Sequence, residues 1–250
     1  MDSLVSIITP SYNSARFIQQ CIESVMSQTY NKWEMIIVDD FSNDNSRDII
    51  NFFCEKDDRI KPVFLEKNIG PSGARNIAMQ KSSGRYIAFL DSDDVWDPYK
   101  LEKQISFMEY NNIAFSYTGY QVISEDGNIR NSIIKVPELI TYHDYLKNTI
   151  IGCLTVILDK TQIGDLKMPD IRTSQDMAFW LLILRNGFSA YGLNESLAKY
   201  RVVRDSNSSN KIRAVKDVWF LYREIEKLNL FYSLWCFINY MFYALKKRIL

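Results

Sequence analysis

Short apolar runs alternate with amphipathic segments through the first part of the chain. The apolar runs are typical of buried strands, and the segments between them carry apolar residues at helical spacing. Strands are predicted at residues 4–9, 33–38, 60–65 and 85–90. Helices are predicted at residues 15–28 and 47–56 and directly after a turn at 68–76. Strands that alternate with helices predict an α/β fold with a mostly parallel sheet covered by helices.

The pattern changes after Pro98. The predicted elements, in chain order, are a helix at 99–110, strands at 113–123 and 129–136, a strand at 153–158, a helix at 175–186 and a polar loop at 200–211. The sequence EDGN between the first two of these strands is typical of a hairpin turn.

Residues 228–245 are rich in aromatic and aliphatic side chains, and the basic residues Lys246, Lys247 and Arg248 follow them. The more polar positions recur every three or four residues, which predicts a helix with a narrow polar stripe. The stripe consists of Asn229, Ser233, Cys236, Tyr240, Tyr243 and Lys247. Polar interruptions leave this run short of the ~20 apolar residues that a spanning helix needs. Two interpretations stay open: a helix lying in a membrane interface, or one docked on the domain or on a second subunit.

The composition of the chain excludes several classes of function. The 250 residues contain 30 Lys plus Arg and 30 Asp plus Glu, so the zero net charge gives no basic footprint for nucleic acid. The four cysteines form no Cys-x-x-Cys pair, which excludes a disulfide framework and a typical zinc site and suits a reducing compartment. His143 is the only histidine and is expected on a surface helix, so any metal must be held by carboxylates, which favour Mg²⁺ or Mn²⁺. The first residues show no secretory signal, which predicts a cytoplasmic protein.

Three carboxylates, those of Asp91, Asp93 and Asp94, fall within the sequence DSDD at the end of the fourth predicted strand. Grouped carboxylates repel one another and are costly to desolvate unless a cation offsets them. A hard metal ion on Asp93, with a nucleotide diphosphate completing its ligands, meets that requirement. The alternative is a solvated turn before the helix that follows Pro98.

Polar residues also follow the first two strands. Pro10, Tyr12 and Asn13 belong to the run SIITPSYN, and Asp39 closes the second strand. Ligands of open α/β sheets bind beyond the carboxyl ends of the strands. Tyr12 offers a ring for stacking on a base, and Asp39 can accept a hydrogen bond from a base N–H. Each segment alone fits an ordinary turn or loop equally well.

The turn NIGPSGARN, residues 68–76, is the third candidate segment. Gly70 and Gly73 allow the backbone to approach a ligand closely. Arg75 can pair with a phosphate or a ribose, and it can equally pair with an acid on the surface.

Together these segments resemble the inverting family-2 glycosyltransferases with a GT-A fold, of the kind that builds bacterial surface polysaccharides. The residues that carry the resemblance are 6–13, 24–30, 38–46, 68–76, 84–94, Gln175, Asp176 and 200–210. The resemblance implies a GT-A domain at residues 1–211, with a Rossmann-like, mostly parallel central sheet flanked by helices. Its nucleotide-binding half is expected at 1–97 and its acceptor half at 98–211, followed by a C-terminal helical extension at 212–250.

The same resemblance implies a nucleotide-diphosphate sugar as donor, most commonly a UDP-sugar, and Mn²⁺ or Mg²⁺ as cofactor. It places Pro10, Tyr12 and Asp39 around the uracil, Asp91 near the ribose, and Asp93 on the metal. The donor-binding residues expected in full are Pro10, Tyr12, Asn13, Asp39, Asn68, Gly70, Arg75, Asp91 and Ser92.

Asp176 aligns with the catalytic aspartate of that family. A sugar hydroxyl is a poor nucleophile, and a positioned carboxylate that takes its proton contributes ~10²–10⁴-fold. One such base facing one metal suffices for a single in-line displacement, which predicts inversion at the anomeric carbon. Asp176 also fits a helix N-terminus, where the dipole favours an acid, and the two roles are compatible.

Two positions depart from the family pattern. Gln175 stands where the family usually has Glu, and Val203 stands where the family loop often carries a His that holds the metal or the diphosphate. Arg201 or Arg204 can supply the positive charge for the phosphates instead, as can Lys211. The alternative is that these are solvated cations of a loop.

The sequence therefore predicts a hexosyl- or N-acetylhexosaminyltransferase of O-antigen, lipopolysaccharide or similar surface polysaccharide synthesis. We expect it to act at the cytoplasmic face of the inner membrane, as a peripheral protein, on a lipid-linked saccharide. The alternative is a non-catalytic subunit that binds a nucleotide sugar, which the departures at Gln175 and Val203 suggest. A nucleotidyltransferase shares the fold style, but it needs a Gly-rich, basic triphosphate loop after the first strand, and PSYNSAR is not one.

Overall fold

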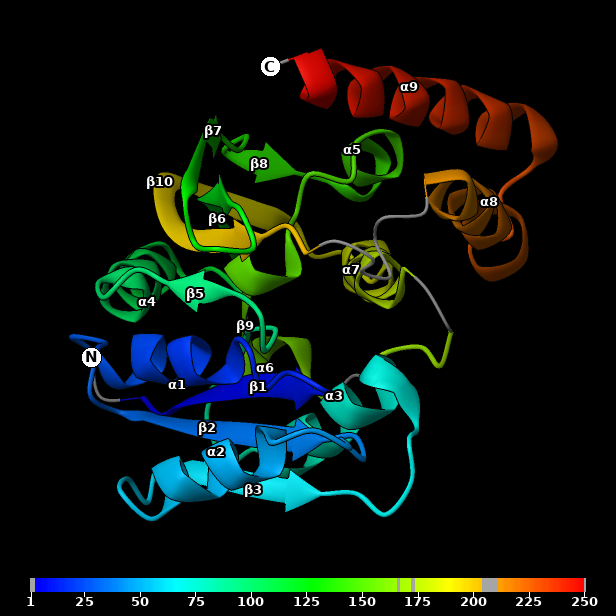
Figure 1. The fold of residues 1–250 in the computed structure, drawn as a ribbon. Helices are drawn as coiled ribbons and strands as arrows, with labels where there is room; N and C mark the ends of the chain where they lie inside the picture. The colour runs from blue at the N-terminus through cyan, green and yellow to red at the C-terminus, as the bar shows by residue number, and fades with distance from the viewer. Residues whose placement is uncertain (1–2, 166, 172–173, 204–210, 250) are drawn as a thin grey trace.

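The computed structural model describes residues 3–165, 167–171, 174–203 and 211–249. Its first half is built on parallel strands joined by helices (Figure 1). The strands are β1 (Val5–Ser11), β2 (Trp33–Asp39), β3 (Ile60–Phe64) and β4 (Tyr86–Phe89). The connecting helices are α1 (Ile18–Met26), α2 (Ser46–Cys54) and α3 (Gly70–Lys81). β1 pairs in parallel with both β2 and β4, and β2 pairs in parallel with β3, as the alternating pattern predicts.

The second half continues the same sheet. Its elements are β5 (Val95–Trp96), α4 (Lys100–Asn111), β6 (Phe115–Ile123), β7 (Ile129–Ile134), β8 (Leu139–Ile140), α5 (Tyr142–Lys147), the 3₁₀ turn η1 (Cys153–Thr155), β9 (Ile157–Asp159), α6 (Lys160–Ile163), α7 (Gln175–Arg185) and β10 (Ala190–Arg201). The strand order is β3-β2-β1-β4-β9-β6-β10-β5, with β7 on β6 and β8 on β10. β9 is antiparallel to both β4 and β6 and so joins the two halves.

Successive residues of β1 point to opposite faces of the sheet, so each face has its own core. Val5 and Ile7 pack in one cluster with apolar residues of α1, α2 and α4. Ile8 packs in the other cluster with residues of α3, α5 and α7, among them Trp180. The two-sided cover that the sequence predicts is confirmed.

Several boundaries were predicted wrongly. The helix α3 already begins at Gly70, within the predicted turn at 68–76, and β10 extends to Arg201, into the predicted loop at 200–211. Residues 153–158 do not begin as a strand, because Cys153–Thr155 forms a 3₁₀ turn and the strand β9 starts only at Ile157. The turn is held by a backbone hydrogen bond from Thr155 N to Gly152 O, and the Thr155 hydroxyl donates to the same oxygen at 2.6 Å. This local bonding competes with the sheet.

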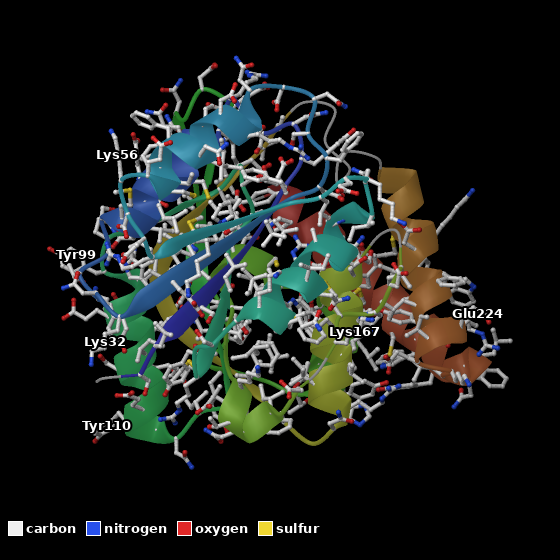
Figure 2. All side chains as sticks on the ribbon, turned by 90° about the horizontal axis from the view of Figure 1, so that it is seen from below. Lys32, Lys56, Tyr99, Tyr110, Lys167 and Glu224 are labelled. Carbon is white, nitrogen blue, oxygen red and sulfur yellow. The ribbon has the colours of Figure 1, made fainter. Side chains whose placement is uncertain are left out.

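The C-terminal extension consists of α8 (Lys211–Phe220), a π-helical turn (Leu221–Ile225) and α9 (Leu230–Ile249). Polar contacts tie it to the domain: Tyr142 Oη donates to Glu226 Oε2 at 2.6 Å, and Arg185 pairs with the same carboxylate at 3.3 Å. Seen from below, Glu224 projects from these helices at the edge of the molecule opposite Lys56 and Tyr99 (Figure 2). Of the helices in the described ranges, none is both long and apolar enough to cross a membrane.

The helix α9 lies on the domain in an unusual orientation. The middle of the polar stripe expected from the sequence faces inward, since Ser233 and Cys236 are fully buried, whereas Asn229 and Tyr243 are exposed. The opposite face is apolar and exposed, with Phe231 84%, Ile238 63% and Phe242 62% accessible. A helix in water normally buries its apolar face and exposes the polar one, so the exposed face of α9 is suited to a further apolar contact.

Candidate active site

A cavity of about 820 Å³ opens at the carboxyl ends of β1 and β4. It is bordered by the start of α3 on one side and by the start of α7 and the segment around η1 on the other. The sequence-predicted residues that line it are Pro10, Tyr12, Asn13, Asn68, Gly70, Arg75, Asp91, Ser92, Asp93 and Asp176. The fold therefore gathers segments more than 160 positions apart in the chain around one space.

The acidic loop lies directly after β4. The backbone N–H of Asp94 donates to Asp91 O at 3.0 Å, which turns the chain so that the carboxylates are grouped. Burial, followed by the nearby charge of Asp91, raises the pKa of Asp93 to about 6. Burial and the charges of Asp93 and Asp91 raise the pKa of Asp94 well above its usual range. The loop is thus electrostatically costly by itself, and a cation would relieve it.

Arg201 lies behind this loop and does not line the cavity. Its backbone N–H donates to Asp94 Oδ1 at 2.8 Å, and its Nε donates to Asp93 O at 2.8 Å. Its Nη2 reaches Gln20 Oε1 at 2.7 Å. The structure therefore places Arg201 as a support of the acidic loop, away from the predicted phosphate position. Arg204, the other predicted phosphate contact, lies outside the described residues.

Arg75 is buried in the cavity wall between two acids. Its Nη2 donates to Asp91 Oδ1 at 2.5 Å, and its Nε is buried without a hydrogen-bond partner. Burial disfavours the guanidinium charge, yet Asp91 and, more weakly, Asp176 raise its pKa on balance. A fixed cation in the wall of a cavity is suited to an anionic ligand.

Asp176 is the second residue of α7 and lines the same cavity as Tyr12. Burial raises its pKa, and the charge of Arg75 partly offsets this effect. A carboxylate with a raised pKa takes up a proton more readily, which is the property required of a general base. Gln175, beside it, is buried and also lines the cavity.

The nucleotide side of the cavity is formed by the loops after β1 and before α3. Tyr12 is 51% exposed at the rim, so its ring is free to receive a planar ligand. Asn13 adopts a left-handed conformation (φ 49°), and its Oδ1 accepts a hydrogen bond from Asn43 N at 2.8 Å. Asn68 donates its Nδ2 to Asp40 O at 3.1 Å. Gly70 begins α3 at φ 82°, where a side chain is disfavoured.

Asp39 lies behind this rim rather than on it. The residue is fully buried, and its carboxylate accepts hydrogen bonds from Ser42 and from Arg47 Nε at 2.7 Å. Its neighbour Asp40 lines the cavity instead and accepts the backbone N–H groups of Ile69 and Gly70 at 2.7 and 2.8 Å. Asp40 thereby fixes the start of α3.

Several cavity residues were not found from the sequence. They are Asp40, Tyr120, Gly152, Cys153, Leu154 and Tyr200. Asp40 could have been found, because it directly follows a predicted strand end. Tyr120 and Tyr200 lie within β6 and β10, and only the pairing of those two strands brings them to the site.

The donor atoms in the cavity suit a hard divalent ion only with help from a ligand. Within the described residues, no three side chains of His, Cys, Asp or Glu lie close enough to hold a metal among themselves. Mg²⁺ and Mn²⁺ are commonly held by one or two carboxylates together with substrate phosphates. Asp93 fits that arrangement, because the neighbouring charges of Asp91 and Asp94 repel its carboxylate and a cation would offset this repulsion.

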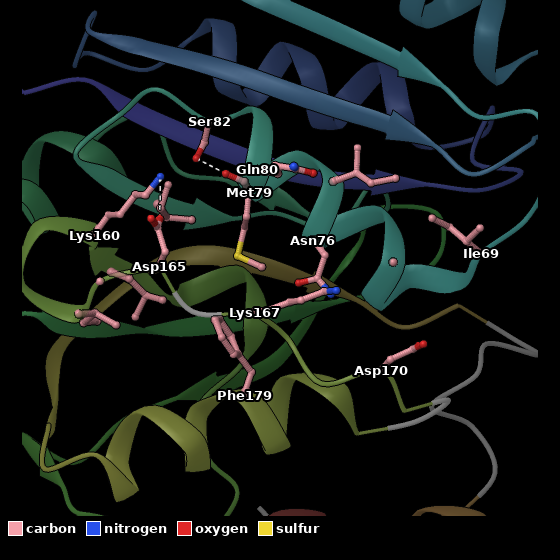
Figure 3. Close-up of a pocket in the computed structure, with 16 residues that line it drawn as sticks. Ile69, Asn76, Met79, Gln80, Ser82, Lys160, Asp165, Lys167, Asp170 and Phe179 are labelled. Carbon is pink, nitrogen blue, oxygen red and sulfur yellow. Dashed lines mark hydrogen bonds and ion pairs between the residues drawn. The ribbon is translucent and has the colours of Figure 1, made fainter.

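A second cavity of about 640 Å³ lies on another face of α3 (Figure 3). Phe179, Ile77 and Leu158 are among its apolar residues, and Lys160 pairs with Asp165 at 3.1 Å on its rim. None of the predicted catalytic or donor-binding residues lines it. The chemistry is therefore concentrated in the first cavity.

Known proteins that are similar to this chain identify its family. Residues 6–160 match the family model Glycosyl transferase family 2. The chain is 53% identical over 246 residues, 98% of each chain, to TuaG of Bacillus subtilis, which is described as a teichuronic acid biosynthesis glycosyltransferase. It is 42% identical, over 99% of its length and 96% of the relative's, to WfgD of Escherichia coli, a UDP-Glc:alpha-D-GlcNAc-diphosphoundecaprenol beta-1,3-glucosyltransferase. The chain belongs to glycosyl transferase family 2.

Solved structures share the fold. TarS of S. aureus in complex with UDP-GlcNAc has a TM-score of 0.72 at 20% identity, covering 88% of this chain and 64% of that one. The mannosyltransferase PcManGT of Pyrobaculum calidifontis, in complex with GDP-Man and Mn²⁺, has a TM-score of 0.71 at 16% identity, covering 92% of this chain and 66% of that one. The predicted GT-A architecture with its C-terminal helices is confirmed.

Proposed function

We propose that this glycosyltransferase moves a sugar from a UDP-sugar to a hydroxyl of a lipid-linked saccharide, with inversion at the anomeric carbon. The observation that carries the proposal is the single cavity in which Asp93 and the strand-end loops face Asp176. TuaG and WfgD act in cell-surface polysaccharide synthesis or on a lipid-diphosphate sugar by description, which supports this acceptor class.

The residues divide the reaction between two sides of the cavity. On one side Tyr12 stacks on the base, and the guanidinium charge of Arg75 attracts the phosphates of the donor. On the other side Asp176 accepts the proton of the acceptor hydroxyl while the oxygen attacks the anomeric carbon. The bond to the UDP oxygen breaks on the face opposite this attack, so one displacement inverts the configuration.

Asp93 is the residue proposed to hold a divalent ion, Mn²⁺ or Mg²⁺, together with the diphosphate of the donor. Such an ion neutralises the charge that develops on the departing diphosphate. Arg201 keeps the loop in place for this role through its bond to Asp93 O. Mn²⁺ accompanies the nucleotide sugar in the PcManGT structure, which supports this cofactor class.

The donor class is tested by a thermal-shift panel of UDP-, GDP-, CDP- and dTDP-sugars with Mn²⁺. We expect the UDP-sugars to raise the melting temperature most, because binding to the folded state alone stabilises it. A larger shift with a GDP-sugar would reassign the donor. No shift with any of the four classes would reject nucleotide-sugar binding altogether.

We further propose that the exposed face of α9 rests on the surface of the membrane that carries the acceptor, at its cytoplasmic side. Its aromatic residues, among them Trp235 at 57% exposure, are the type that favours a bilayer interface. Lys246, Lys247 and Arg248 follow these aromatic residues in the sequence, and anionic lipids attract such basic residues.

The membrane contact is tested by flotation with vesicles of phosphatidylglycerol and phosphatidylethanolamine. Replacing Phe231, Trp235 and Ile238 together with serine removes most of the apolar contact, so we expect the variant to stay with the soluble fraction. Tyr110→Ser, an exposed aromatic on α4, is the control and should float like the parent. Equal flotation of the triple variant and the parent would contradict the role of α9.

A further inference from the structure

One residue in the wall of the active-site cavity is a glycine, and the residues around it have large side chains. Gly152 lines the cavity beside Leu154 and Tyr120. The ring of Tyr200 stands edge-on to that of Tyr120, with the two centroids 6.2 Å apart. These residues come from β6, β10 and the segment before η1, so the wall belongs to the second half of the molecule.

The backbone does not require glycine at this position. Gly152 has φ −82° and ψ 136°, an extended conformation that every residue type adopts. A Cβ atom added there would lie 3.5 Å from Tyr120 Cε1, an ordinary contact, and 3.2 Å from Leu154 Cδ2. The second contact is at the tip of a flexible side chain, so alanine fits after a small shift of Leu154. Thr155 Cγ2 would lie 3.7 Å from the same Cβ, so a side chain larger than alanine has to displace Leu154 or the Tyr120 ring.

Gly152 and Cys153 line the same cavity as the acidic loop and Asp176. In the proposed function the donor diphosphate is held at Asp93 and the acceptor hydroxyl at Asp176. The transferred sugar is joined to that diphosphate and is attacked by that hydroxyl, so it occupies this cavity.

We infer that Gly152 sets the room for the sugar ring of the donor and that this ring lies against Tyr120. The inference rests on the proposed function and extends it to the sugar subsite. A branched side chain at position 152 enters the space of the sugar or pushes Tyr120 into it. The nucleotide subsite, formed by the loops after β1 and before α3, is on the other side of the cavity and is left intact.

The test compares the binding of UDP, UDP-glucose and UDP-N-acetylglucosamine by calorimetry, with Mn²⁺, to the parent protein and to Gly152→Val. We expect the Kd of both UDP-sugars to rise about 10-fold or more, since one or two excess methyl groups in a pocket have effects of that size. The Kd of UDP itself should not change. Gly152→Ala is the matched size variant, and it should raise the Kd of the UDP-sugars less than Gly152→Val does.

Other binding results would overturn either the inference or the proposed function. Unchanged UDP-sugar binding in Gly152→Val overturns the inference and leaves the proposed function standing. Equal loss of UDP and UDP-sugar binding also overturns it, because residue 152 then supports the whole site. Failure of the parent protein to bind UDP or either UDP-sugar rejects the proposed function itself.

Discussion

Asp176→Asn should lower the rate of sugar transfer by about 10²–10⁴-fold, the range that a positioned general base contributes. Asparagine has nearly the same shape as aspartate but cannot take a proton from the acceptor hydroxyl. The proposed donor contacts are made by other residues of the cavity, so the Kd of UDP should stay close to that of the parent. The measurement is the turnover number from UDP release in the presence of a lipid-linked saccharide, with the Kd of UDP taken separately.

Asp170→Asn is a suitable control, because this exposed carboxylate lies six positions earlier and lines the second cavity instead of the first. It should transfer sugar at the parental rate. If Asp176→Asn transferred sugar at the rate of the parent, the assignment of the base would be wrong. If the parent bound the donor without turnover, the protein would instead be a non-catalytic nucleotide-sugar-binding subunit, which the residues Gln175 and Val203 suggested.

The first half of the fold was predictable because each strand and helix there has the hydrophobic pattern typical of its type. β1 and β2 are apolar runs that end in polar residues, and the helices between them carry apolar residues at regular helical spacing. Parallel strands end at one edge of a sheet, so the grouping of Tyr12 and Asp91 at that edge followed from the order of elements alone. The cavity confirms that grouping.

The second half was less predictable because its structure depends on distant pairing. β10 (Ala190–Arg201) was not predicted, since Gly192, Asn194 and Glu195 interrupt its apolar pattern and its register against β6 shifts twice. Gly192 fits there because a Cβ atom would lie 2.0 Å from Pro137 O. Neither constraint is visible in a single sequence.

The contacts of polar residues with distant segments of the chain could not be predicted from the sequence either. Lys100 begins α4 yet is fully buried, where its Nζ donates to Gln104 Oε1 at 2.5 Å and burial lowers its pKa to about 7. Arg201 was predicted as a phosphate contact, but its Nε donates to Asp93 O, so its guanidinium supports the acidic loop. A residue type predicts which bonds are possible, and only the fold decides which partner is within reach.

Replacing Asp93 should have two effects of opposite sign on stability. Burial beside Asp91 raises the pKa of Asp93 to about 6, so above that pH its charge destabilises the folded state. Asp93→Asn removes that charge, and the ligand-free variant should melt at a higher temperature than the parent at pH 7.5. The same substitution removes the proposed metal ligand, so the extra stabilisation by UDP with Mn²⁺ should disappear and transfer should be lost.

The stabilisation by UDP with Mn²⁺ that Asp93→Asn should lose has an expected size. A ligand at 100 times its Kd stabilises the folded state by about 2.7 kcal/mol, which corresponds to about 5–10 °C for a chain of this size. Melting curves with UDP, with Mn²⁺ and with both should show that gain in the parent and in Asp58→Asn, an exposed acidic residue used as control. A full Mn²⁺-dependent gain in Asp93→Asn would show that the ion is held elsewhere. Asp93→Asn should therefore raise the stability of the ligand-free protein and abolish the Mn²⁺-dependent stabilisation by UDP. Both results together would mean that the acidic loop destabilises the ligand-free protein and is stabilised when a cation and a diphosphate bind.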